Sequence, residues 1–296
     1  MSSDRTATME RAPPRAADRL PPHLFFVISA VFHYLGPSFA VLLFASLAPS
    51  GVAWLRIASA GLVFALWRRP WRAFATLPPR DRIIIAALGA VLAAMNTLFY
   101  EAIARLPLAT VGAIEFFGPI ALAAWGARTR RNFAALVLAA CGVYVLTGVR
   151  FSGEPLGYLF AFANCALFMA YIILGHQISA GGAGVPGIDR LGCAMLAATL
   201  AALPFGFREA LPAFSDPRLL CAAVGVGISS SVIPYVCDQL AMARLPRASF
   251  ALLLSLLPAS AAVIGFIVLH QVPSFAEASG IMLVIAGVAL HQAERA

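Results

Sequence analysis

The chain contains one tetrapeptide twice, as Ala104-Arg105-Leu106-Pro107 and as Ala243-Arg244-Leu245-Pro246. Each copy is followed twelve residues later by another proline, Pro119 or Pro258. Each copy also links two long apolar runs near the end of its half of the chain, and each half contains five such runs. We therefore predict that the second half duplicates the first. Because five crossings are an odd number, the duplicate enters the bilayer from the opposite face, which gives an inverted repeat typical of secondary transporters.

The amino-acid composition is typical of a membrane protein. Of the 296 residues, 61% are hydrophobic and only 11% are charged, too few to cover a soluble domain with polar surface. Ten spans of roughly 20 residues occupy about two thirds of the chain and leave only short connections. The predicted fold is an all-α membrane protein with ten transmembrane helices in two inverted five-helix repeats.

The apolar runs set the predicted boundaries. Residues 1–21 form a disordered N-terminal segment, 22–153 the first repeat, 154–292 the second repeat and 293–296 a short tail. In the first repeat the spans are 24–48, 51–67, 83–103, 107–127 and 133–149. In the second they are 156–178, 191–207, 219–242, 248–271 and 275–291.

The net charge of +8 is explained by topology. All 21 basic residues are arginines, and most of them lie in segments that face inside if the N-terminus is cytoplasmic. This bias follows the positive-inside rule and places both termini in the cytoplasm. A bacterial cytoplasmic membrane is the expected location, and a nucleic-acid partner is not expected.

No sequence feature indicates an enzyme. The five cysteines stand singly in apolar runs, which favours neither a disulfide framework nor a zinc site. The sequence has no HExxH, no GxSxG elbow and no phosphate-binding loop. We therefore expect no catalytic activity, no cofactor and no metal.

Glu115 is the sharpest functional candidate. It lies eight residues into the fourth predicted span, about 12 Å along a helix and hence near the bilayer centre. A charge there costs at least about 2.5 kcal/mol, so the side chain is expected to face the bundle interior. It can carry a proton or balance the ammonium group of a substrate. The alternative is a structural carboxyl bonded to a neighbouring helix or to Arg56.

His33 falls at a similar depth in the first span. Its imidazole can bond a substrate or share a proton with Glu115, although a lone histidine on an apolar helix is more often structural. Neutral polar and aromatic residues complete a predicted cavity lining, with interhelical hydrogen bonding as the alternative role. The lining candidates are His33, Tyr34, Asn96, Tyr100, Glu115, Asn164, Tyr171, Tyr235 and Ser255.

Two further residues are candidates for a gate. Asp238 lies near the inner end of the eighth span, where it can reach interfacial water or Arg244, and it serves as either a gate or an anchor. Pro258 lies inside the ninth span and can bend that helix. Arg56 lies near the outer end of the second span, so we expect its guanidinium to reach the interface. Binding a substrate carboxylate is its alternative role.

Two other groups have structural interpretations. Glu101 and Arg105 are spaced for an ion pair within one helix. Ser274 followed by Glu277 predicts a capping box at the start of the last span.

Part of the chain resembles a known family. Met95-Asn96, Leu98-Phe99-Tyr100, Pro107-Leu108, Glu115-Phe116 and Gly118-Pro119 resemble spans three and four of the threonine/homoserine exporters. Those exporters belong to the EamA-type branch of the drug/metabolite transporter superfamily. Pro234-Tyr235, Arg244-Leu245-Pro246 and Leu55-Arg56 resemble other parts of the same pattern. The resemblance implies ten helices, amino-acid export and a central cavity lined by spans one, three, four, six, eight and nine.

The chain departs from that family pattern at three places. Leu257 replaces a common glutamate before Pro258, His270-Gln271 replaces Gly-Glu, and Asp238 stands where the family has a glutamate. These departures leave Glu115 as the only expected acid near the midplane.

The predicted function is that of a secondary transporter that exports amino acids and similar small metabolites by alternating access. Its expected partners are a small-molecule substrate and the lipid bilayer, while the oligomeric state and the coupling to protons stay open. One alternative is an exporter of cationic drugs or other metabolites. The other is a non-transporting membrane scaffold or channel subunit.

Overall fold

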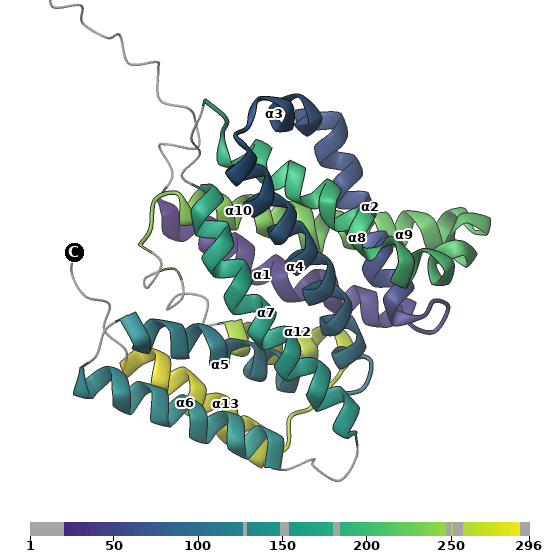
Figure 1. Ribbon diagram of the computed structural model, residues 1–296. Coiled ribbons are helices and arrows are strands. Elements are labelled where there is room, and N and C mark those ends of the chain that lie inside the picture. Colours follow the sequence, from purple (N-terminus) through teal and green to yellow (C-terminus); the bar gives the residue numbers. More distant parts are fainter. Residues whose placement is uncertain are drawn as a thin grey trace, which may run out of the picture.

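The computed structural model describes residues 21–126, 129–148, 154–179, 184–246, 250 and 257–290, which form a helical bundle (Figure 1). The first half contains α1 (Pro22–Leu43), α2 (Pro49–Arg68), α3 (Pro70–Thr76), α4 (Pro79–Ile103), α5 (Leu108–Gly126) and α6 (Arg130–Gly148). The second contains α7 (Pro155–Ser179), α8 (Gly187–Ser215), α9 (Pro217–Gly227), the π-helix η2 (Ile228–Val232), α10 (Ile233–Met242), α12 (Leu257–Leu269) and α13 (Phe275–Leu290).

Proline marks the beginning of many of these helices. Proline is the first residue of α1, α2, α3, α4, α7 and α9. A proline at this position loses nothing, because the first amides of a helix have no partner within the helix. The start of α13 is fixed differently. The Ser274 amide donates to Glu277 Oε2 at 2.8 Å and the Glu277 amide donates to Ser274 Oγ at 3.3 Å, which confirms the predicted capping box.

Helices occur at the predicted spans, with shifted ends. Within the described residues, six helices are long and apolar enough to cross a membrane: α1 from Leu24, α2, α4, α7, α8 and the continuous run from α9 to α10. The short helix α3 was not predicted. It follows Arg69, which takes a left-handed conformation with φ of 48°, and it carries the exposed Trp71 and Phe74. Aromatic rings beside arginines are typical of the membrane interface.

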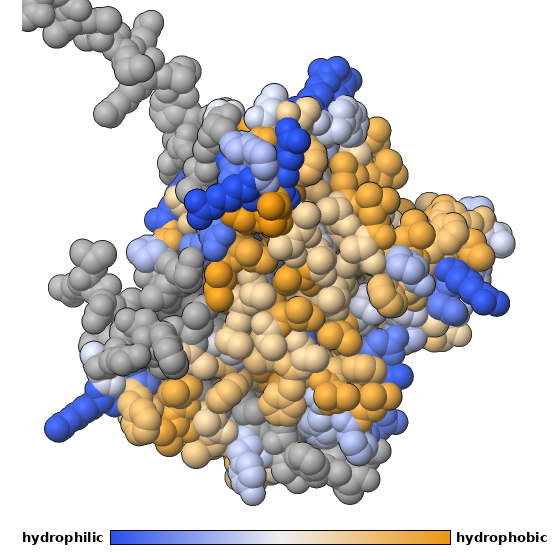
Figure 2. All heavy atoms as spheres, in the orientation of Figure 1, coloured by the Kyte–Doolittle hydropathy of each residue, from blue (hydrophilic) through white to orange (hydrophobic). Residues whose placement is uncertain are grey.

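The outer surface is largely apolar. Large side chains such as Leu66, Leu200 and Phe205 are exposed, and Figure 2 shows hydrophobic residues across most of the visible face, with hydrophilic residues towards its margins. Inside the bundle, Tyr34, Tyr100, Tyr171 and Tyr235 are among the largest fully buried side chains. Four tyrosines therefore share the interior with aliphatic residues such as Leu88, while many other large aliphatic side chains face outward.

Helices of the two halves pack against each other in antiparallel pairs. Near the start of α2, the Trp54 ring lies 5.1 Å from that of Phe207 near the end of α8. At the other end of α2, Arg68 pairs with Asp189 at the start of α8, at 2.5 Å. Figure 1 shows α6 and α13 side by side at the edge of the bundle. Arg131 at the start of α6 donates to the carbonyl of Leu290 at the end of α13, at 2.7 Å.

Glycine permits the close approach of α6 and α13. A Cβ atom added at Gly142 would lie 2.6 Å from the Gly280 carbonyl oxygen, closer than real Cβ atoms come. The helices therefore meet backbone to backbone at these small residues.

The helix that runs from α9 to α10 changes its winding in the middle. Residues Ile228–Val232 form the π-helix η2, directly before Pro234. An α-helix would bond the Ser230 carbonyl to the amide of residue 234, but proline has no N–H. The Ser230 carbonyl instead accepts from Arg56 Nη2 on α2, at 2.6 Å. A side chain of the first half thus completes the backbone hydrogen bonding of the second.

Candidate functional site

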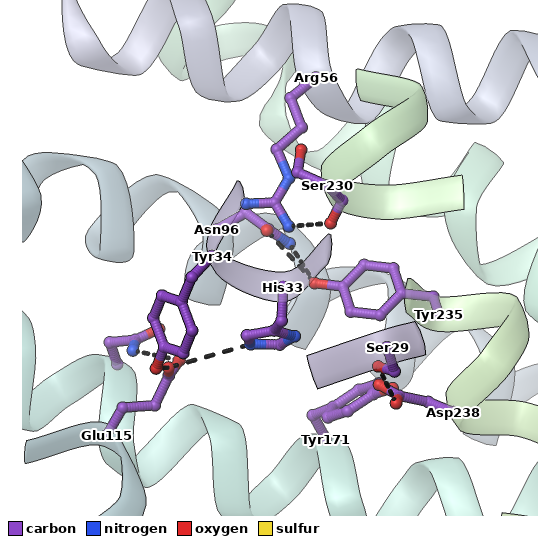
Figure 3. A network of polar contacts seen from close by, with 11 residues as sticks. Ser29, His33, Tyr34, Arg56, Asn96, Glu115, Tyr171, Ser230, Tyr235 and Asp238 are labelled. Carbon is purple, nitrogen blue, oxygen red and sulfur yellow. Dashed lines mark hydrogen bonds and ion pairs between the residues drawn. The ribbon is translucent and has the colours of Figure 1, made fainter. Parts of the chain in front are cut away.

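A cluster of polar side chains lies at the centre of the bundle, where α1, α2, α4, α5, α7 and α10 meet (Figure 3). The cavity between them has a volume of about 10 Å³, room for about one water molecule. Its lining residues are His33, Arg56, Met95, Asn96, Phe99, Glu115, Asn164 and Tyr235. The structure therefore brings together five of the nine predicted lining residues around one small cavity and adds Arg56 to them.

Glu115 is the acidic residue of this cavity. It is only 2% exposed, and its side chain points into the bundle. Tyr34 donates to its Oε2 at 3.1 Å and Asn164 donates to its Oε1 at 2.9 Å. The two donors come from α1 and α7, one in each half of the chain. Glu115 is therefore held from both halves and does not bond Arg56 directly.

His33 stands next to Glu115 in the middle of the cluster. Its Nε2 lies 4.0 Å from Glu115 Oε2, and its ring packs edge-on against Tyr34 and Phe168. Among the described residues, nothing bonds its Nδ1. A proton can pass between His33 and Glu115 after a small movement, and the second ring nitrogen stays available for a ligand.

Arg56 lies inside the bundle, and the prediction that its guanidinium reaches the interface is wrong. It is only 3% exposed. Its Nε donates to Ser231 Oγ at 2.7 Å and its Nη2 to the Ser230 carbonyl at 2.6 Å. The guanidinium carbon also lies 5.3 Å from the centre of the Tyr100 ring. The carbonyl that Pro234 leaves without its α-helical donor attracts the side chain inward, which sequence spacing alone does not reveal.

Asn96 and Tyr235 form a pair across the cavity. The Asn96 amide donates to the Tyr235 hydroxyl at 3.2 Å, and it also donates to the Leu92 carbonyl at 2.7 Å. The two residues are 139 positions apart, the same separation as the two Ala-Arg-Leu-Pro copies. The contact therefore joins two residues whose spacing matches that of the repeated tetrapeptide.

Asp238 lies deeper than predicted. We expected it to reach interfacial water or Arg244. It is instead fully buried and bonds side chains of two other helices. Ser29 donates to its Oδ1 at 2.5 Å and Tyr171 donates to its Oδ2 at 2.9 Å. The interior therefore holds two acids rather than one, and Figure 3 shows them on opposite sides of His33.

The remaining candidates are distributed around the cavity. Tyr34 and Tyr171 do not line the cavity, and they donate to Glu115 and Asp238 respectively. Tyr100 packs against Arg56, and its hydroxyl has no partner among the described residues. Ser255 lies outside the described residues. Pro258 belongs to the first turn of α12, and only its backbone is described.

Sequence reasoning missed three serines of this region, Ser29, Ser230 and Ser231. Ser29 and Ser231 bond Asp238 and Arg56 respectively, and Ser230 offers its carbonyl to Arg56. The run of three serines from Ser229 in an apolar segment was a visible signal. Ser29 gave no such signal, because a single serine in an apolar helix is common.

A larger cavity lies elsewhere. It has a volume of about 450 Å³ and lies between the α4–α5 connection and the α12–α13 connection. Its wall includes Arg105, Gln271 and Glu277, and Arg105 also forms the predicted ion pair with Glu101, at 2.5 Å. None of the candidate site residues lines it. The central cluster is therefore the better candidate for chemistry.

Known proteins resemble this chain along most of its length. The threonine/homoserine exporter RhtA of Salmonella typhimurium strain LT2 is 32% identical over 264 residues, which cover 87% of this chain and 88% of that protein. RhtA of Escherichia coli K12 is 32% identical over 243 residues, which cover 80% and 79%. A solved crystal structure that is 18% identical shares the fold, with a TM-score of 0.60 over 91% of this chain and 95% of that one.

A family model matches the second half of the chain. The model describes the EamA-like transporter family, and it matches residues 155–291. Together with the identity to the RhtA proteins and the apolar helices, this match shows a multi-pass membrane protein. The chain belongs to the EamA-like transporter family.

Proposed function

We propose that this protein exports amino acids and similar small metabolites across the cytoplasmic membrane by alternating access. One observation carries the proposal. The carboxylate of Glu115 is buried beside a small cavity and is held by Tyr34 and Asn164, one donor from each half of the chain. An intramembrane carboxyl at the interface between two halves is the expected place for a substrate ammonium or a proton. The RhtA relatives are exporters of threonine and homoserine by name, which supports the substrate class.

The packing supports two inverted repeats, residues 22–153 and 154–292. Duplicated spans of opposite orientation should run antiparallel, as α2 does against α8 and α6 does against α13. The contact between Asn96 and Tyr235 also fits, because equivalent residues of two repeats touch only at the axis that relates them. On this proposal ten helices cross the membrane and both termini are cytoplasmic. The ion pair of Asp81 with Arg190 supports the assignment of these two residues to the same side of the membrane.

The small volume of the cavity fits one stage of the transport cycle. A space of about 10 Å³ holds a water molecule and no amino acid. The halves must separate on one side to admit a substrate and then on the other to release it. Asp238, which joins α10 to α1 and α7, and Pro258, in the first turn of α12, are the proposed gating residues.

Protons are the proposed driving ion. Glu115 and His33 lie 4.0 Å apart, so one proton shared between them can exchange for the ammonium of a substrate. Asn96 and Asn164 provide amide groups for the polar part of the cargo, and Tyr235 provides a hydroxyl.

Flux measurements on the purified protein in liposomes test this function. A panel of labelled amino acids should show saturable counterflow, with threonine and homoserine among the transported compounds. Cysteine replacement of Asn96 or Tyr100 should give sites that a small polar thiol reagent labels and that substrate protects. Absence of saturable flux, together with no labelling, would favour a scaffold. Transport of a quaternary amine in preference to every amino acid would favour a drug exporter.

A further inference from the structure

Arg56 differs from other buried and half-buried arginines of the described chain. Arg68, Arg105 and Arg190 each pair with a carboxylate, from Asp189, Glu101 and Asp81 respectively. Arg56 is as buried as Arg190, at 3% and 4% exposure. Yet no carboxylate of the described residues lies within 4.0 Å of its guanidinium nitrogens.

The bonds that Arg56 makes leave its charge without an anion. Its two acceptors, Ser231 Oγ and the Ser230 carbonyl, are neutral. Those bonds use Nε and one N–H of Nη2, and no described residue accepts from Nη1. A guanidinium has five N–H donors, so the remaining N–H groups of Nη1 and Nη2 can donate to a ligand. Its neighbour Tyr100 offers a ring face to the cation, which compensates the charge only in part.

An uncompensated cation inside a membrane protein is costly, and such residues face the route of a substrate or ion. The free side of Arg56 borders the central cavity, which Glu115 borders from another helix. Figure 3 shows Arg56 and Glu115 on different sides of the cluster, with Asn96 and His33 between them. The cavity therefore has one wall that suits an anion and another that suits a cation.

We propose that Arg56 binds the carboxylate of the cargo while Glu115 binds its ammonium, so that the site selects free zwitterionic α-amino acids. This inference rests on the proposed function and makes it more specific. The fork of Nη1 and Nη2 fits the two oxygens of a carboxylate. The Ser230 carbonyl and Ser231 hydroxyl hold the guanidinium in place, and Pro234 leaves that carbonyl without its α-helical donor.

The proposal excludes cargo that lacks either charge. Threonine methyl ester keeps the ammonium and has no carboxylate, while N-acetylthreonine keeps the carboxylate and has no ammonium. A charge-assisted contact is worth about tenfold or more in affinity. Threonine should therefore exceed each derivative by at least about tenfold in competition for counterflow by the wild-type protein.

Two substitutions locate this selectivity at Arg56. Arg56→Gln should lower threonine transport by about tenfold more than it lowers transport of the methyl ester. Arg56→Lys keeps the charge and should restore part of the preference for threonine. The matched control is Arg190→Gln, which also removes a buried arginine but lies outside the cavity. It should leave the ratio of threonine to ester unchanged.

The outcomes separate the inference from the proposed function. If the wild-type protein carries no amino acid, the proposed function itself fails. If it carries threonine and the ester equally well, only the zwitterion site fails. An equal loss of both compounds in Arg56→Gln would show that Arg56 merely bonds the Ser230 carbonyl, and would overturn the inference. Should Arg56→Gln not fold, the wild-type comparison and Arg56→Lys still decide.

Discussion

The two buried acids at the centre of the bundle, Glu115 and Asp238, have similar partners and different surroundings. Glu115 and Asp238 each accept from one tyrosine and from one smaller polar side chain. The half of the chain that provides the tyrosine differs between the two acids. Helix α1 gives Tyr34 to Glu115 and Ser29 to Asp238, whereas α7 gives Asn164 to Glu115 and Tyr171 to Asp238. Only Glu115 borders the cavity, beside His33 and Arg56.

This difference separates two roles for one kind of residue. Asp238 is enclosed on every side, and its two oxygens join α10 to α1 and α7. It therefore acts on the arrangement of helices. Glu115 has the same kind of support but also faces a space that a ligand or a proton can enter. On the proposed function, a carboxylate thus serves the cargo at Glu115 and the packing of the bundle at Asp238.

Replacing Glu115 should have the largest effect on transport. Glu115→Gln keeps the size of the side chain and removes the ability to carry charge, so pH-driven counterflow in proteoliposomes should be abolished. The unfolding temperature in detergent should change little, because the amide can still accept from Tyr34. Unchanged pH dependence would remove Glu115 from the coupling mechanism.

Replacing Asp238 should instead destabilise the protein. Asp238→Ala leaves the hydroxyls of Ser29 and Tyr171 buried without an acceptor, which costs about 1–3 kcal/mol for each group. A clearly lower unfolding temperature in detergent is the expected result, with the preference among amino acids retained by the protein that remains folded. A normal unfolding temperature combined with an altered substrate preference would reverse the two assigned roles.

The two tyrosines offer a smaller and more closely matched test. Tyr34→Phe and Tyr171→Phe each remove one hydroxyl, and an interhelical hydrogen bond in a membrane protein is worth about 0.6 kcal/mol. Tyr34→Phe should alter the pH dependence of counterflow, because its partner is Glu115. Tyr171→Phe should lower only the unfolding temperature. Identical behaviour of both variants would contradict the distinction between the two acids.

The smallest effect is expected at an acid outside both clusters. Glu101, near the end of α4, pairs with Arg105 in the connection that follows, near the larger cavity. Such partly exposed pairs contribute about 0.2–1 kcal/mol. Glu101→Gln should therefore leave flux and its pH dependence close to those of the wild-type protein. A strong transport defect here would show that the route of the cargo passes through the larger cavity.

The sequence revealed the elements of this fold better than their contacts. Apolar runs and prolines located the helices, and the capping box and the pair of Glu101 with Arg105 followed from spacing alone. The burial of Glu115 also followed, because a charge inside a long apolar run has few tolerable positions.

Contacts between distant helices could not be read in the same way. The side chain of Arg56 points inward because it donates to a backbone carbonyl that lacks its usual donor. Pro234 removes that donor, and it lies on a helix of the other half. The enclosure of Asp238 depends on Ser29, which lies 209 positions away. Contacts of this kind can be identified only in the folded structure, where the two halves lie together.

The contact between Asn96 and Tyr235 has a mechanical consequence. Suppose that the two halves exchange conformations during each transport cycle. Every atom then moves relative to the equivalent atom of the other half, except the atoms on the axis that relates the two halves. On the proposed inverted repeat this pair lies on that axis, and it should act as a stationary pivot. Distance probes placed there should read the same value with either side of the protein open, while probes farther out swing in opposite directions.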